Sequence, residues 1–130
     1  MADVFKVVDT GLGITTNRLK NGDTGATEPK YAHWGTGATA AANGDTALQT
    51  ARAEARVSGT TTRETTNTTN DTYQCVATIT CASTSAAITE YGQFDASSNG
   101  NMFIRGTFDA INVSVGDSIQ FTSKAVFDQA

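Results

Sequence analysis

Alternation of apolar and polar residues is clearest in the second half of the chain, where it predicts antiparallel β-strands. Over 73–81 every second residue is apolar or small, and the side chains expected to face the core are Tyr73, Cys75, Ala77, Ile79 and Cys81. Further strands are expected over 86–94, 101–108 and 119–127. The segments Ser97-Ser98-Asn99-Gly100 and Val115-Gly116-Asp117 contain the residues that tight turns need.

The first half of the chain is less regular, and its pattern predicts short elements. We expect a strand over 4–8, a second strand over 14–16 after two loop glycines, a loop over 21–28 and an apolar strand over 31–34. Within 38–56, Asp45 can cap a short helix in which Ala47, Leu48, Ala51 and Ala55 have helical spacing.

The stretch 59–72 consists almost wholly of Thr, Asn, Arg and Glu. It is open to two interpretations, a flexible low-complexity loop or an exposed strand that leads into the strand at Tyr73. Because Thr favours strands whereas flexible linkers favour Gly and Ser, we expect a long edge strand or an arm.

Composition supports the β pattern. The 130 residues fit one domain, and the chain is 38% hydrophobic and only 17% charged, with Thr, Gly, Ala and Asn in place of the Glu, Lys and Leu of long helices. We therefore predict an all-β, single-domain antiparallel β-sandwich or jelly-roll-like barrel with at most one short helix. Residues 1–30 are interpreted as a possible extended N-terminal arm.

Charge and hydropathy restrict the expected partners. The net charge of −4 and the dispersed basic residues argue against nucleic acid, which is bound through clustered Lys and Arg. No apolar run approaches the roughly 20 residues that cross a bilayer, and the N-terminus does not resemble a secretory signal, so we expect no membrane partner and synthesis in a cytoplasm. The glycosylation sequons at Asn67, Asn70 and Asn112 are then expected to stay unused.

The two cysteines are expected to be buried and unpaired. Cys75 and Cys81 share one face of a single strand, roughly 20 Å apart at about 3.3 Å per residue. A disulfide needs Cα atoms within about 7 Å, so a straight strand keeps these two thiols apart.

The sequence contains no recognisable catalytic or metal-binding motif, and we predict neither an enzyme nor a cofactor. His33 is the one histidine, which is too few for a zinc site, and no serine has a nucleophile-elbow motif around it. Asp95 and Asp109 are interpreted as turn residues at strand ends.

Two further patterns also have simple structural interpretations. Gly11-x-Gly13 and Gly35-x-Gly37 are interpreted as loop glycines, because neither pair continues into a phosphate-binding motif. Four arginines could line a basic patch, but Glu54 and Glu64 interleave with three of them, which favours solvated ion pairs; the four are Arg52, Arg56, Arg63 and Arg105.

Several motifs in a fixed order resemble a group of small virion structural proteins of tailed bacteriophages. They are Tyr31-Ala32-His33-Trp34-Gly35-Thr36-Gly37, Asp45-Thr46-Ala47-Leu48, Ile88-Thr89-Glu90-Tyr91-Gly92-Gln93-Phe94-Asp95-Ala96, Gly100-Asn101-Met102-Phe103-Ile104-Arg105, Phe108-Asp109-Ala110-Ile111-Asn112-Val113 and Gly116-Asp117-Ser118-Ile119-Gln120-Phe121-Thr122. The resemblance extends over most of the chain from Tyr31 onward and brings no catalytic residues with it.

This resemblance implies a capsid decoration, or cement, protein that binds the outside of the phage head and assembles in the host bacterial cytoplasm. The implied partners are the major capsid protein or other virion proteins, and the protein is expected to form a trimer or dimer. A tail, baseplate or fibre-attachment component is the alternative. A third hypothesis, a carbohydrate-binding module, rests on Tyr31, Trp34 and Tyr91 as stacking groups.

Overall fold

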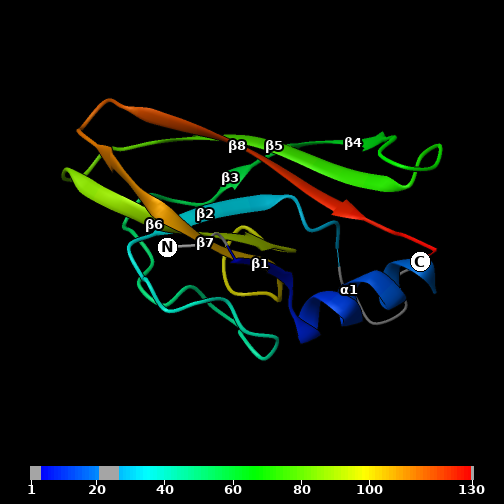
Figure 1. Cartoon of the computed structure of the whole chain (residues 1–130). Helices are drawn as coiled ribbons and strands as arrows, with labels where there is room; N and C mark the ends of the chain where they lie inside the picture. Colours follow the sequence, from blue (N-terminus) through cyan, green and yellow to red (C-terminus); the bar gives the residue numbers. More distant parts are fainter. Residues whose placement is uncertain (1–3, 21–26, 130) are drawn as a thin grey trace.

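Two antiparallel sheets pack face to face in the computed structural model, which describes residues 4–20 and 27–129 (Figure 1). The five-stranded sheet has the order β1-β7-β6-β2-β3, and the three-stranded sheet has the order β4-β5-β8. The elements are β1 (Val4–Val7), α1 (Asp9–Leu19), β2 (Tyr31–Gly35), β3 (Val57–Ser58), β4 (Thr60–Glu64), β5 (Thr72–Thr80), β6 (Ala86–Phe94), β7 (Met102–Val113) and β8 (Ser118–Val126). This architecture confirms the predicted all-β, sandwich-like single domain with one short helix.

The main core lies between the two sheets and follows from the period-two pattern. Trp34 on β2 and Tyr91 on β6 pack against Ile79 on β5, and all three side chains are buried. Cys75, Ala77 and Cys81 are buried as predicted, while Tyr73 is half-buried. The alternation along 73–81 therefore places the correct face of this strand inward.

The opposite face of the five-stranded sheet is also covered, which the period-two pattern does not predict. Seven successive residues of β7, Met102 to Phe108, are buried. One face of β7 contacts the core between the sheets, and the other is covered by the long coil that connects β2 to β3. α1 also packs on β7, where Ile14 meets Phe103 and Ile104 together with Ala125 of β8. Leu48 from this coil packs with Phe94 and Met102.

A predicted strand and a predicted pair of loop glycines in the first half are wrong. The segment 14–16 is the middle of α1 rather than a strand, and Gly11 and Gly13 lie in this helix rather than in a loop. Gly11 is where α1 touches the backbone of β7, because a Cβ there would overlap the carbonyl oxygen of Phe103. Close packing therefore outweighs the weak helix propensity of a segment with two glycines and three threonines.

The helix predicted within 38–56 is also wrong, because no helix occurs there. Its backbone instead runs as a coil whose amides bond to a carboxylate described below. The predicted arm over 1–30 does not match residues 4–19, which are folded onto the domain. Val4 to Val7 pair with Ile104 to Thr107, and α1 follows against β7 (Figure 1). Most of the loop predicted over 21–28 lies outside the described residues.

An edge strand occurs within the predicted segment 59–72, but it covers only Thr60–Glu64. β4 forms one edge of the three-stranded sheet, and the chain then turns around Asp71, whose carboxylate accepts bonds from the amides of Thr66, Asn67 and Thr68. The last predicted strand is found as β8, and β7 continues beyond the predicted end at 108 as far as Val113.

Both predicted turns are confirmed. Asn99 and Gly100 have φ of 55° and 67°, and Gly116 has φ of 96°. In the described part of the chain no helix is long and apolar enough to span a bilayer.

The two helical glycines make a matched pair for testing how α1 is held. We expect Gly11→Ala to lower the free energy of unfolding by about 1–3 kcal/mol, because the methyl group forces α1 away from Phe103. Gly13 is exposed, and a methyl group added there would meet no atom within 4 Å. Gly13→Ala should therefore raise the free energy of unfolding by up to about 1 kcal/mol. Urea unfolding measures both. Equal effects of the two substitutions would contradict this packing.

Candidate interaction surface

The carboxylate of Glu90 on β6 is fully buried and holds the long coil against the sheet. Its Oε2 accepts hydrogen bonds from the amides of Gly37 and Thr50, each at 2.8 Å, and its Oε1 accepts one from the amide of Gln49 at 2.8 Å. Arg105 on the neighbouring β7 donates to Oε1 from Nε at 3.2 Å and from Nη2 at 3.0 Å. One side chain thus connects two strands with the start of the coil at Gly37 and with its later part at Gln49 and Thr50.

Glycines allow the coil to approach this carboxylate. A Cβ at Gly35 would lie 2.6 Å from Oε2 of Glu90, and one at Gly37 would meet the same oxygen. Burial raises the pKa of Glu90, but the hydrogen bonds from Thr50, Gln49, Gly37 and Arg105 outweigh burial, so the pKa lies below its ordinary value. The group is a buried, ionised structural anchor, and its lone pairs are occupied by donors from the protein itself.

The arginines do not form a common patch. Arg105 is only 2% exposed and pairs with Glu90 and with Asp45, so the interpretation as a solvated ion pair is wrong for this residue. Its place in the middle of β7, beneath the coil, accounts for the burial. Arg52 pairs with Glu54 at 3.3 Å as expected, but the two side chains are only 13% and 5% exposed, so this pair is not solvated.

The remaining predicted polar residues have structural roles. Nε2 of His33 lies 3.1 Å and 2.7 Å from the carbonyl oxygens of Arg52 and Glu54 and so hydrogen-bonds to the backbone of the coil. Asp95 accepts a bond from the amide of Asn101 at 2.7 Å and closes a turn. Asp109 lies within β7 and not at a strand end, so its interpretation as a turn residue is wrong; β7 simply continues past it.

Two of the three aromatic residues considered for carbohydrate stacking are inaccessible to a ligand. Trp34 is 0% exposed and Tyr91 is 1% exposed, because both point into the core between the sheets. The indole Nε1 of Trp34 donates to Glu54 at 2.9 Å. Tyr31 is half-buried and packs against the cluster of Leu48, Phe94 and Met102. Among the described residues no group of three His, Cys, Asp or Glu is placed to hold a metal ion.

A row of four aromatic rings runs from the core to the surface on one side of the sandwich. Tyr91 contacts Phe121 with ring centroids 4.8 Å apart, Phe121 contacts Phe108 at 6.0 Å, and Phe108 stacks on Phe5 at 6.2 Å. Phe5 is 54% exposed, so the hydrophobic core opens to solvent here. Gly106 makes room for this ring, since any Cβ at that position would overlap it.

The open side is bordered by one edge strand from each sheet. β1 ends the five-stranded sheet and β8 ends the three-stranded sheet. Between them lies a groove of about 350 Å³, and a second depression of about 410 Å³ continues from it along Phe5 and Phe121 toward Ile111. We call this surface the β1/β8 groove.

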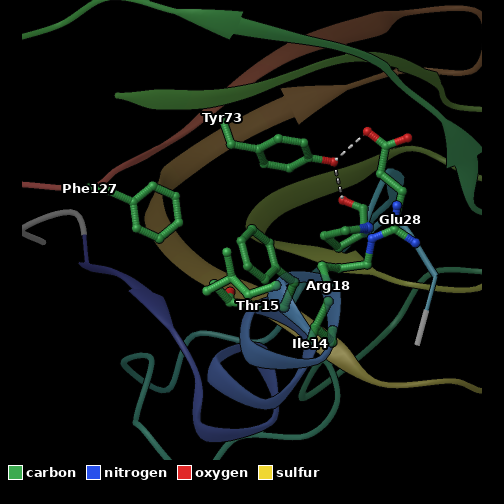
Figure 2. A pocket seen from close by; sticks show the side chains of 9 residues that line it. Ile14, Thr15, Arg18, Glu28, Tyr73 and Phe127 are labelled. Carbon is green, nitrogen blue, oxygen red and sulfur yellow. Dashed lines mark hydrogen bonds between the residues drawn. The ribbon is translucent and has the colours of Figure 1, made fainter. Parts of the chain in front are cut away.

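A second apolar pocket, of about 380 Å³, lies beside α1 (Figure 2). Ile14, Thr15 and Arg18 of the helix line one side, and Tyr73 and Phe127 line the other (Figure 2). The hydroxyl of Tyr73 donates to Glu28 at 3.2 Å and is also 3.4 Å from the carbonyl oxygen of Pro29. These bonds orient the tyrosine ring as part of the wall and leave an apolar interior.

Sequence reasoning did not identify the β1/β8 groove. The signal present in the sequence was the apolar pair Phe5 and Val7 on the N-terminal strand, together with continued alternation through Phe121. Neither shows that β1 lies beyond the last strand of the opposite sheet, because that depends on the strand order. Comparison with protein-family models, with curated proteins and with solved structures found no match to the chain.

Removing the charge of the Glu90 anchor tests its contribution to stability. Glu90→Gln leaves the Arg105 charge without its buried partner and should lower the free energy of unfolding by about 3–5 kcal/mol at neutral pH. The double variant Glu90→Gln/Arg105→Met, which removes both buried charges, should recover part of this loss. No recovery would show that the coil contacts, rather than the ion pair, dominate.

The same variant has an expected pH dependence. Because the pKa of Glu90 is lower in the folded chain, its contribution is complete above the ordinary glutamate pKa and is lost as the pH falls through the folded value. The difference in unfolding free energy between the original chain and Glu90→Gln should therefore shrink from neutral pH to about pH 3. Urea unfolding across this range measures it, and a constant difference would contradict the assignment.

The thiols should be inert in the folded chain. Both cysteines are free and buried, and burial, followed by the charge of Glu28, raises the pKa of Cys75 to about 11. Iodoacetamide at mildly alkaline pH should add no mass to the native protein but should label both thiols in concentrated guanidinium chloride. Rapid labelling of the native chain would place a thiol at the surface and contradict this packing.

Proposed function

We propose that this chain is a structural protein of a tailed-bacteriophage virion, specifically a capsid decoration protein that binds and stabilises the outer surface of the head. The observation that carries the proposal is the open side of the sandwich, where the core reaches the surface through Phe5 between two edge strands. Such a surface favours contact with another protein, because apolar side chains and unpaired strand edges are both satisfied by a docked polypeptide.

The rest of the domain supports a binding role over a catalytic one. The polar side chains singled out in the sequence bond within the protein: Glu90 with the coil and Arg105, His33 with backbone carbonyls, and Asp95 with a turn. The Glu90 anchor fixes the coil on one face of the five-stranded sheet. The sheet that carries one side of the β1/β8 groove is therefore held in one conformation by buried bonds. A rigid surface loses little conformational entropy on binding.

The proposed partners are the major capsid protein or other virion proteins, with the decoration protein itself acting as a dimer or trimer. Repeated binding to a symmetric shell favours closed oligomers on local symmetry axes. The motifs that resemble those of phage virion proteins support a role as a virion component. The small size, the acidic charge and the β fold of the domain favour a position on the head over one on the tail. A tail, baseplate or fibre-attachment component is the alternative that the following experiment separates.

The number of copies in a purified particle tests this function. We would purify the phage particles whose genome encodes this chain and count its copies by quantitative mass spectrometry. On the order of hundreds of copies per particle are expected, as repeated binding over a capsid requires. Electron cryomicroscopy should place the corresponding density on the outside of the head. A handful of copies located on the tail would favour the alternative, and absence from the particle would overturn the proposal.

A further inference from the structure

We infer that the β1/β8 groove receives an extended segment of a partner protein, apolar with flanking acidic residues, which pairs with β8 as an additional strand. The inference deepens the proposed function, on which only the identity of the partner as a virion protein depends. Three observations support it: the shape and lining of the groove, the direction of the backbone groups of β8, and the charge at the rims.

The groove has the lining expected for an extended chain with alternating side chains. Its accessible apolar floor is formed by Phe5 of β1 and Phe121 of β8, whereas Tyr91 and Ile104, only 1% and 5% exposed, add almost no accessible area. From Ile119 to Val126 the β8 wall is roughly 23 Å long at 3.3 Å per residue, enough for a strand of ordinary length. An extended segment would place every second side chain against this apolar floor.

Among the described residues β8 pairs with another strand on one side only, and the register identifies its open edge. The amide of Phe127 donates to the carbonyl oxygen of Asp71 at 2.9 Å, on the side of β5. Because backbone groups of successive residues in an antiparallel strand alternate in direction, the odd-numbered residues of β8 bond to β5. The even-numbered residues therefore direct their amides and carbonyls away from β5, toward the open side; they are Ser118, Gln120, Thr122, Lys124 and Val126.

The charge at the rims indicates the chemistry of the occupant. The chain has a net charge of −4, yet the two charged residues that line the 350 Å³ part of the groove, between the two strands, are both cations, Lys6 on β1 and Lys124 on β8. Both are exposed. Asp109 lines the second depression. Acidic residues on either side of an apolar stretch complement this arrangement, with the apolar residues on the floor and a carboxylate near each rim.

The same charges disfavour a second copy of this chain as the occupant. β8 has one charged residue, Lys124, and no acidic one, so two copies that paired edge to edge through β8 would bring two lysines and no carboxylate of β8 to the shared edge. Like charges close together across an interface destabilise it. A partner with acidic residues avoids this repulsion.

Site-specific photo-crosslinking tests the inference in cells that express the chain from its own locus. We would replace Gln120, whose side chain is exposed beside the open edge, with p-benzoylphenylalanine, and use the same replacement of Arg63 on the opposite edge strand β4 as control. The expected adduct from position 120 contains one partner polypeptide. Peptide mapping should locate the crosslink in an apolar segment with Asp or Glu on both sides, and position 63 should give no such adduct.

Three further variants, each combined with the probe at position 120, test the pairing and the charge. Thr122→Pro removes an amide that points to the open edge without removing a bond to β5, and should reduce the adduct about tenfold. Thr122→Val keeps the amide and should leave the adduct unchanged. The double charge reversal Lys6→Glu/Lys124→Glu should also reduce it about tenfold. Circular dichroism verifies folding, and the charge reversal decides the test if the proline variant does not fold.

The presence and sensitivity of the adduct test the inference about the groove. The identity of the crosslinked partner tests the proposed function separately. An adduct with a second copy, an adduct insensitive to both Thr122→Pro and the charge reversal, equal crosslinking from position 63, or no adduct would overturn the inference. A mapped acidic-flanked segment from a protein that is not part of a virion would support the groove and overturn the decoration function. The same segment from a virion protein would support both.

Discussion

The arrangement of this domain depends on the fully buried carboxylate of Glu90. Glu90 is excluded from solvent, and burial of a carboxylate is tolerated only when donors surround it. Three backbone amides of the coil and the guanidinium of Arg105 supply these donors. The coil consequently covers one face of β6 and β7, while the β1/β8 groove and the pocket beside α1 lie elsewhere on the domain.

Much of the fold could be predicted because local pattern and burial agree in the second half of the chain. From Tyr73 onward, each strand has one face toward the core between the sheets and each turn has the residue it needs, such as Gly116. The first half differs, since its elements are determined by distant partners. Helix α1 exists where Gly11 fits against Phe103, and the coil takes its path from Glu90, contacts that no local window of sequence contains.

The site was less predictable than the fold for the same reason. The residues with apparent chemistry proved structural, and several of the motifs on which the resemblance rests include residues of the anchor or of its contact with the coil: Gly35, Gly37, Glu90, Gly92 and Arg105. Those motifs describe how the coil is fixed to the sheet. The exposed groove depends instead on Phe5 lying next to strands from the far end of the chain, a relation that only the strand order reveals.

The position of β1 also has a consequence for how the chain acquires its structure during synthesis. Val4 pairs with Thr107, so the N-terminal strand has no neighbour until most of the polypeptide has been made. At roughly 5–20 residues per second, this delay lasts on the order of 5–20 seconds. Pairings between such distant residues also slow folding. Throughout this interval Phe5 and Val7 remain uncovered on the nascent chain, so a chaperone at the ribosome would encounter them before β7 does.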